Sequence, residues 1–148
     1  MKGKEEKVLI RSMEPGDIDA VLAIDRKLIG LRRAITYGIN EVIGGQFDFS
    51  FVSEINDEII GFVLASVIYF YEPEMVTDAC VIQVVGVDPD YWRKGIATRL
   101  IQTLLNTSRS KGIKKVRVMV DQNDKQLSSF FQRIGFRHGR FISYSIDV

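Results

Sequence analysis

The chain has very few of the residues from which metal and disulfide sites are built. Its 148 residues include one cysteine, Cys80, and one histidine, His138. A single cysteine forms no intrachain disulfide, and one cysteine with one histidine cannot supply the ligands of a structural zinc site. The sequence therefore predicts no metal, and a protein of a reducing compartment such as the cytoplasm.

Long apolar runs and a strong excess of one charge are missing as well. No run approaches the roughly 20 apolar residues that a membrane span needs, and the charged stretch Met1–Lys7 lacks the apolar core of a signal peptide. The formal net charge is +1 at pH 7, whereas nucleic-acid-binding domains are usually strongly basic. We therefore expect no membrane and no nucleic acid among the partners.

The common nucleotide-binding motifs are also absent. The chain has neither the two glycines followed by Lys and Ser/Thr of a phosphate loop nor the three-glycine spacing of a dinucleotide site. Without a metal cluster or a flavin or nicotinamide motif, any chemistry must use a small diffusible cosubstrate.

What is present is a short basic loop with one glycine. It joins an apolar strand that ends at Val87 to a helix whose apolar residues recur with helical spacing from Ile96 onward. The first turn of such a helix has unpaired N–H groups and partial positive charge. Gly95 lets the backbone approach a ligand, and Arg93 and Lys94 add cationic side chains. The loop indicates a phosphate or diphosphate site, although solvated basic residues also begin many helices.

Periodicity along the chain predicts one mixed α/β domain over residues 1–148, with residues 1–6 as a flexible tail. The expected order is β-α-α-β-β-β-α-β-α-β, with helices on both faces of a twisted sheet. The expected strands are 7–13, 47–55, 58–70, 79–87, 114–121 and 136–148, and the expected helices are 18–29, 31–43, 96–111 and 127–134. Asn56-Asp57 is expected to close a hairpin, and Phe47, Phe49 and Phe51 to share one buried strand face.

Several segments resemble, in chain order, the motifs of the GCN5-related N-acetyltransferase (GNAT) superfamily. Leu9–Met13 with Asp17 resembles its opening strand and first helix, and Val85–Tyr91 its central strand and turn. Arg93–Ala97 resembles the core of its acetyl-CoA loop, Q/R-x-x-G-x-G/A, and Phe131–Phe136 its late Y-E-K-x-G-F signature. The resemblance covers about the whole chain and implies the GNAT fold, with a mixed, mostly antiparallel sheet.

Three positions depart from the family pattern. Trp92 occupies the first position of the loop, where Gln or Arg is usual. Phe131 replaces the tyrosine that protonates the departing CoA thiolate in many members, and a phenylalanine has no proton to give. The asparagine often found seven residues earlier is also displaced, since that position is Asp124, with Asn123 beside it.

The resemblance implies an enzyme that moves the acetyl group of acetyl-CoA directly to a primary amine, in a small molecule or in a peptide or protein, through a ternary complex. It implies that the pantetheine arm lies beside Val85, Gly86 and Val87. The diphosphate would be held by Arg93, Lys94, Gly95, Ile96, Ala97 and Thr98. Further CoA contacts would come from Asn123, Phe130 and Phe131.

The general base and general acid are not fixed by the sequence. The candidates for the base are Asp78, Gln83 (through an ordered water), Glu72 and Glu74, and those for the acid are Tyr144 on the expected last strand, Tyr69 and Tyr71. Residues of these kinds are more often ordinary solvated or half-packed side chains than catalytic groups. The expected loop around 71–78, with the aromatic and acidic stretch Tyr69–Glu74, suits a wall of the acceptor site for a cationic amine.

A second function stays open because of Phe131: a non-catalytic acyl-CoA-binding or regulatory GNAT module. Tight CoA binding without acetyl transfer would distinguish it from the enzyme. The final strand and the first helices commonly build dimer contacts in this family, which makes a homodimer a reasonable expectation.

Overall fold

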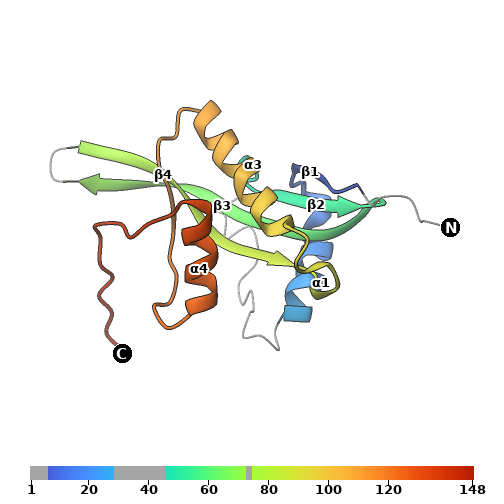
Figure 1. Cartoon of the computed structure of the whole chain (residues 1–148). Coiled ribbons are helices and arrows are strands. Elements are labelled where there is room, and N and C mark those ends of the chain that lie inside the picture. Colours follow the sequence, from blue (N-terminus) through green and yellow to red (C-terminus); the bar gives the residue numbers. More distant parts are fainter. Residues whose placement is uncertain (1–6, 29–45, 73–74) are drawn as a thin grey trace. The chain divides into compact units, whose positions relative to one another are not determined.

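The computed structural model describes residues 7–28, 46–72 and 75–148, and the chain divides into two compact units, Met1–Val118 and Met119–Val148 (Figure 1). The first unit holds strands β1 (Leu9–Ser12), β2 (Phe51–Ile55), β3 (Glu58–Glu72), β4 (Met75–Val87) and β5 (Val116–Val118), helices α1 (Ile18–Leu28) and α3 (Ile96–Ser110), and 3₁₀ helices η1 (Pro15–Asp17) and η3 (Pro89–Tyr91); the second holds α4 (Lys125–Ile134). The predicted tail 1–6 and the predicted helix 31–43 lie outside the described residues. No helix within the described ranges is long and apolar enough to cross a membrane.

The five strands form one sheet in the order β1-β2-β3-β4-β5. The first three neighbouring pairs are antiparallel, and β5 runs parallel to β4. The mixed, mostly antiparallel sheet is therefore confirmed. The predicted hairpin between β2 and β3 is also confirmed: Asn56 and Asp57 both have positive φ, of 50° and 64°, which is the geometry of a tight hairpin turn.

Helices α1 and α3 cover opposite faces of the sheet. A Cβ added at Gly61 would meet the Ile96 side chain of α3, whereas one added at Gly86 would meet Leu28 of α1 and the ring of Phe62. Neighbouring residues of a strand point to opposite faces of the sheet. Gly61 faces α3 and Phe62 faces α1, so the two helices lie on opposite sides of the sheet.

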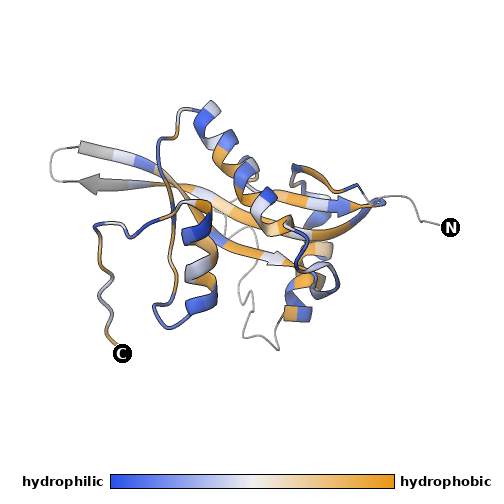
Figure 2. Cartoon of the chain, in the orientation of Figure 1, coloured by the Kyte–Doolittle hydropathy of each residue, from blue (hydrophilic) through white to orange (hydrophobic). Residues whose placement is uncertain are grey.

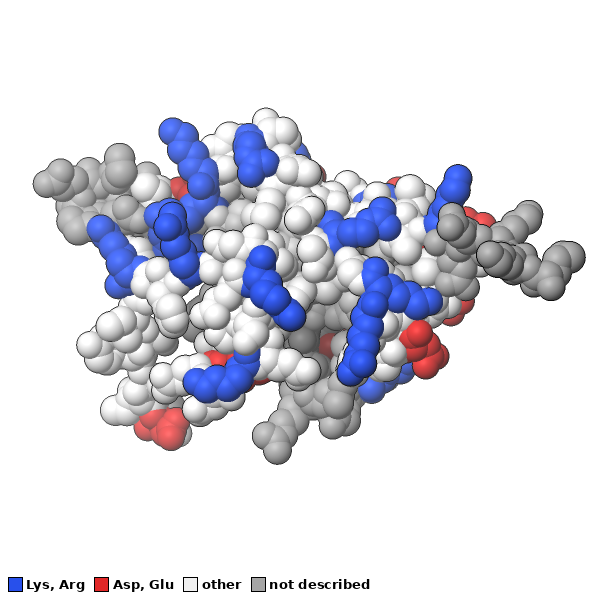
Figure 3. Space-filling view, viewed as in Figure 1, with Lys and Arg blue, Asp and Glu red and all other residues white. Residues whose placement is uncertain are grey.

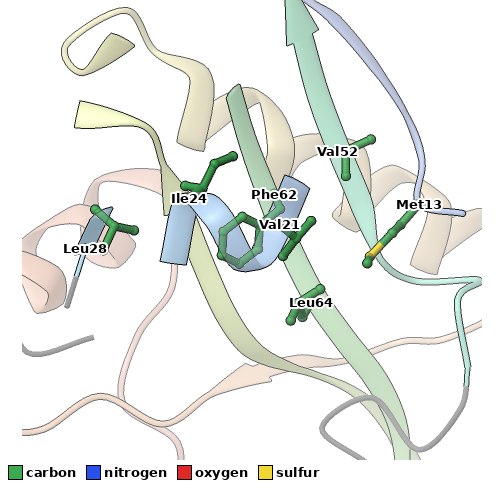
Figure 4. Packing of buried hydrophobic residues seen from close by; sticks show 7 residues of the cluster. All are labelled: Met13, Val21, Ile24, Leu28, Val52, Phe62 and Leu64. Atoms are coloured by element: carbon green, nitrogen blue, oxygen red, sulfur yellow. The ribbon is translucent and has the colours of Figure 1, made fainter. Parts of the chain in front are cut away.

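The core on the α1 face is built from helical and strand residues that are far apart in sequence. Figure 4 shows this cluster, and Figure 2 shows the hydrophobic residues along the middle of β3 and β4 that it uses. Its buried members are Met13, Val21, Ile24, Leu28, Val52, Phe62 and Leu64. Burial of these side chains, at about 1.5–3 kcal/mol for each large one, holds α1 against the sheet.

Strand β2 begins at Phe51, later in the chain than the predicted strand 47–55. Residues 47–50 form a turn, closed by the Ser50 N–H donating to the Phe47 carbonyl at 3.2 Å. Phe47 packs against the α1-side cluster, while the ring of Phe49 lies 5.1 Å from Lys111 Nζ. The prediction that these phenylalanines share one strand face with Phe51 is therefore wrong, because strand alternation does not apply in a turn.

Two further predictions of strand and loop are wrong. Within the expected loop at 71–78, residues 71–72 continue β3 and residues 75–78 belong to β4, and the two strands stay paired out to Glu72 and Met75. The expected strand at 136–148 does not form, since this range contains neither helix nor strand. Apolar and polar residues alternate in this range, as they do in a strand with one buried face. A strand also needs a neighbouring strand that pairs with its backbone N–H and C=O groups. β5 is shorter than predicted for the same reason, because its ladder has only three residues on each side.

An ion-pair cluster fixes the start of α1. Asp17 accepts two hydrogen bonds from the Arg11 guanidinium, at 2.8 and 2.9 Å, and one from the Glu14 N–H at 2.8 Å. Arg11 Nε also lies 3.3 Å from Glu54 on β2. The hydrogen bonds from Arg11 hold the pKa of Asp17 below its usual range despite burial.

This shift gives a pH-dependent contribution to stability. A carboxyl whose folded pKa is depressed stabilises the fold above its unfolded pKa of about 3.9 and loses that contribution as the pH falls through the folded value. We expect Asp17→Asn to lower the free energy of unfolding by about 1–2 kcal/mol at pH 7. The difference from the unmodified protein should shrink at pH 3. Urea denaturation of both proteins at the two pH values measures it, and an equal difference at both would contradict the assignment.

Candidate functional site

The edge of β4 becomes accessible where the ladder with β5 ends. β5 pairs only with Cys80–Ile82, while β4 continues to Val87. A bulge lies at the same point: Leu64 pairs with Val84 and Ala65 with Ile82, so Gln83 is the extra residue of β4. Beyond the bulge, no further strand of the described chain lies on the β5 side. An extended ligand with amide groups can add there as a strand does.

The chain turns sharply after β4 and is held by hydrogen bonds on both sides of the turn. Asp88 caps η3, because its Oδ1 accepts from the Asp90 N–H at 3.0 Å. The Trp92 N–H donates to the Pro89 carbonyl at 3.2 Å. The Trp92 indole Nε1–H donates back to the Val87 carbonyl at 2.7 Å. The side chain at the atypical loop position thus ties the loop to the end of β4.

Helix α3 begins without a cap from the protein's own side chains. Its N-cap is Gly95, in the left-handed conformation with φ 73°, and its first turn contains no acidic residue. The N–H groups at such a helix start have no intrahelical acceptor and carry partial positive charge. A Cβ at Gly95 would meet nothing within 4 Å, so there is open space beside this residue. We call residues 93–98 the amide cradle.

The amide cradle includes two basic residues, and Figure 3 shows Lys and Arg spread over this face of the molecule, including the region where α3 begins. Arg93 is exposed and has a positive φ of 63°. Lys94 Nζ lies 5.4 Å from the centre of the Tyr91 ring, a cation–π contact. The side chain of Ile96 is buried against the sheet, so this residue offers only its N–H. The combination of amides, helix dipole and cations suits a diphosphate.

The second unit contains the late motif, and its local geometry explains the residues there. Asp124 caps α4 by accepting from the Leu127 N–H at 3.0 Å. Gly135 ends the helix with φ 116°, a conformation that favours glycine. The Phe131 ring is buried and packs edge-on against Phe130 and Phe136, with 5.1 Å between ring centres in both pairs. Asn123 is exposed, and its N–H donates to Asp121 at 2.8 Å.

Residues 26–136 of the sequence match the family described as the acetyltransferase (GNAT) family. This region contains β4, the amide cradle and α4. The chain belongs to this family. The resemblance to GNAT proteins that the sequence indicated is therefore confirmed.

Two curated relatives are also N-acetyltransferases by name. Over 89 residues, the chain is 30% identical to an uncharacterized N-acetyltransferase of Methanocaldococcus jannaschii, covering 60% of this chain and 39% of that protein. Over 101 residues it is 28% identical to N-alpha-acetyltransferase 30 of Schizosaccharomyces pombe, covering 68% of this chain and 65% of that protein. The chain thus spans less than two thirds of the length of these relatives.

Among solved structures, the GNAT chain resembles the aminoglycoside N-acetyltransferase AAC(6′)-Iy in complex with a bisubstrate analogue, CoA-S-monomethyl-acetylneamine. The TM-score is 0.74 at 20% sequence identity, and the match covers 96% of this chain and 99% of that chain. At this identity the likeness shows the shared fold. Within the described residues, no group of three or more His, Cys, Asp or Glu side chains is arranged to hold a metal ion.

The predicted catalytic residues of this GNAT chain fall at separate places. Gln83 is exposed at the β4 bulge, where the ladder with β5 ends. Asp78 pairs with Tyr69 near the other end of β4, roughly 16 Å from Gln83 at about 3.3 Å per strand residue. Tyr144 lies in the second unit, is 93% exposed and stands on no strand. Their catalytic roles stay predictions, and of the two on β4, Gln83 is the one that lies where β4 leaves β5.

Residues Tyr69–Glu72 are strand rather than the predicted loop, and their part in an acceptor site stays a prediction. β3 extends through Glu72, and Tyr69 is 67% exposed on that strand. Glu74 lies outside the described residues. The aromatic residues continue a ladder with β4, which is consistent with the β propensity of Tyr and Phe.

The single cysteine is unsuited to covalent catalysis. Cys80 is fully buried on β4, and burial raises the pKa of its thiol to about 11. The thiolate is the nucleophilic form of cysteine, so this residue is inert at neutral pH.

One pair of residues that sequence reasoning missed lies at the end of β4. Lys27 Nζ of α1 lies 2.6 Å from Asp88 Oδ2, although the two are 61 positions apart. Burial acts to raise the pKa of Asp88, but the hydrogen bonds from Lys27 and the Asp90 N–H outweigh it and lower the pKa below its usual range. The Asp-Pro pair marks a turn in the sequence, but no local pattern reveals Lys27.

Proposed function

We propose that the chain is an acetyl-CoA-dependent N-acetyltransferase that acts in the cytoplasm, with its amide cradle binding the diphosphate of CoA. The observation that carries the proposal is the uncapped start of α3, which follows the part of β4 that extends beyond its ladder with β5. Family membership supports the chemistry, and the CoA-containing ligand bound to AAC(6′)-Iy supports the cosubstrate.

The proposed reaction transfers the acetyl group directly from CoA to the amine within a ternary complex. The uncharged amine nitrogen attacks the thioester carbonyl, a C–N bond forms, and the C–S bond breaks. The amine loses one proton to a base or a water chain, and the CoA thiolate leaves and gains a proton from solvent or an acid. Backbone N–H groups of β4 between Val85 and Val87 are proposed to stabilise the oxyanion, with Gln83 ordering the water that accepts the proton.

The first test is binding. Trp92 is the only tryptophan, adjoins the amide cradle and is 46% exposed, so its fluorescence reports on this site alone. We expect CoA to change that fluorescence and to release or absorb heat in calorimetry with the same Kd. Desulfo-CoA, which keeps the diphosphate, should bind in the same way, whereas pantetheine should not change the Trp92 signal. Absence of heat with CoA would remove the enzymatic proposal.

The second test identifies the acceptor class. The names of the relatives suggest peptide N-terminal amines and aminoglycosides as probes, to which lysine peptides and polyamines are added. Release of free CoA that depends on one of these amines is the expected result. Binding of CoA without turnover over this panel would contradict the enzymatic proposal.

A second candidate function rests on Phe131. This residue carries no dissociable proton and is held between two other aromatic rings, so it cannot protonate a thiolate. The alternative is therefore a non-catalytic acyl-CoA-binding or regulatory module. This alternative predicts CoA binding with no acetyl transfer at any pH. The enzymatic proposal instead predicts activity without a tyrosine at this position, because water can protonate the departing CoA thiolate.

We also propose a homodimer. Residues 141–148 expose a series of apolar side chains at alternate positions, with Ile142, Tyr144 and Ile146 at least three quarters exposed. A segment of this pattern gains stability by pairing with another strand. Sedimentation analysis of the whole chain tests the proposal, and a monomer at high concentration would contradict it.

A further inference from the structure

Asp88 is the junction at which four hydrogen bonds meet, between the end of β4 and the amide cradle. Its backbone N–H donates to the Ile60 carbonyl of β3 at 2.8 Å, and its carbonyl accepts from the Tyr91 N–H at 2.9 Å. Its two carboxylate oxygens take different partners, the Asp90 N–H and Lys27 Nζ. The residue is 6% exposed, so its orientation is set by the protein.

The segment that follows needs such a constraint. Arg93 holds a left-handed backbone with φ 63°, a conformation that is unfavourable for a residue with a Cβ. Strained conformations of this kind persist where the surroundings hold them. The hydrogen bonds of Asp88 and Trp92 hold the five residues before Arg93, and therefore limit the conformations open to the cradle.

Lys27 extends this constraint to α1. It lies next to Leu28, the last residue of α1, whose side chain packs at the position of Gly86 on β4. The ion pair with Asp88 thus fastens the end of α1 to the start of the loop. The Lys27 side chain is half exposed, while the Asp88 side chain is almost fully buried.

We infer that Asp88 is a positioning residue for the amide cradle, and that Lys27 holds its carboxylate in the orientation that keeps the cradle ready for a diphosphate. This inference rests on the proposed function, since it assigns the cradle to CoA. Preorganised donors bind more tightly because binding no longer has to order them. Loss of the carboxylate should therefore weaken binding of the diphosphate, although Asp88 does not contact it.

The substitutions separate the two contacts of the carboxylate. Asp88→Ala removes both, whereas Asp88→Asn keeps an oxygen acceptor for the Asp90 N–H and loses only the charge partner of Lys27. We expect Asp88→Ala to raise the calorimetric Kd for CoA about tenfold, on the scale of a lost turn or helix cap. Asp88→Asn and Lys27→Met should each raise it by about threefold and by the same factor as each other, because both remove the same ion pair.

A purely structural role is tested with a donor that lacks the diphosphate. The kcat/KM for S-acetylpantetheine should be the same in the unmodified protein and in each variant, while KM for acetyl-CoA rises with the Kd for CoA. Asp17 provides the matched control, because it is also a buried carboxylate that pairs with a cation and accepts a backbone N–H at a 3₁₀ turn. Asp17→Ala should lower Tm as Asp88→Ala does and leave the Kd for CoA unchanged.

The outcomes distinguish this inference from the proposed function. CoA binding to the unmodified protein with an unchanged Kd in Asp88→Ala and Lys27→Met overturns the inference alone. Lack of CoA binding to the unmodified protein overturns the proposed function and the inference with it. Equal losses for both acetyl donors would also overturn the inference. If Asp88→Ala does not fold, Asp88→Asn and Lys27→Met decide, since Lys27 is half exposed and its loss leaves the core intact.

Discussion

Replacing Gly95 with valine is expected to weaken CoA binding by about a hundredfold while the protein stays folded. A Cβ at this position would meet no atom within 4 Å, so the new side chain starts in open space. If the amide cradle binds the diphosphate as proposed, a valine side chain at its N-cap competes with the ligand. The backbone φ of 73° is also unfavourable for valine and would shift the adjacent N–H groups. Loss of two charge-assisted hydrogen bonds accounts for about this factor, and calorimetry with CoA measures it.

The chain contains a closely matched control at the other end of α3. Gly112 also has a positive φ, of 81°, and a Cβ there also meets nothing within 4 Å. Gly95→Val and Gly112→Val therefore impose a similar backbone strain, and each should cost about 1–2 kcal/mol of stability. Only Gly95→Val should lose CoA. Equal CoA affinity in the two variants would show that the diphosphate lies elsewhere.

The sequence predicts those parts of the fold that local chemistry determines. Helix α1 begins at Ile18 and α3 at Ile96, as the apolar spacing and the turn residues before them indicate. The Asn56-Asp57 turn forms where predicted, because both residues tolerate positive φ. The amide cradle follows β4 as expected, since a strand, a turn and a helix start in succession leave little choice of geometry.

Features that depend on distant partners are not visible in the sequence. The bulge at Gln83 arises from the register between β3 and β4, which no single strand encodes. β3 continues through Glu72 and β4 begins at Met75 because each strand has the other to pair with, whereas residues 136–148 have an alternating pattern but form no strand. The pair of Lys27 and Asp88 needs the packing of α1 on the sheet before the two side chains meet.

Replacing Phe62 with alanine is expected to have the largest effect on stability, about 3–5 kcal/mol. Phe62 is fully buried in the centre of the sheet, on the face that α1 covers, and its ring lies against the backbone of Gly86. Removing it leaves a cavity between α1 and β4 that the surrounding strands cannot close. Urea denaturation measures the loss, and Tyr69→Ala on the same strand is the control, because Tyr69 is 67% exposed and should cost little.

A double-mutant cycle tests the contact itself. A Cβ at Gly86 would lie 2.9 Å from the Phe62 ring and 3.0 Å from Leu28, so Gly86→Ala should destabilise the protein by about 1–3 kcal/mol through overpacking. In the Phe62→Ala background, the closer of these two clashes is gone and the added methyl group occupies part of the cavity. Gly86→Ala should then cost less than it does alone, with a coupling of at least about 0.5 kcal/mol. Strict additivity of the two effects on the free energy of unfolding would contradict the packing of the Phe62 ring on Gly86.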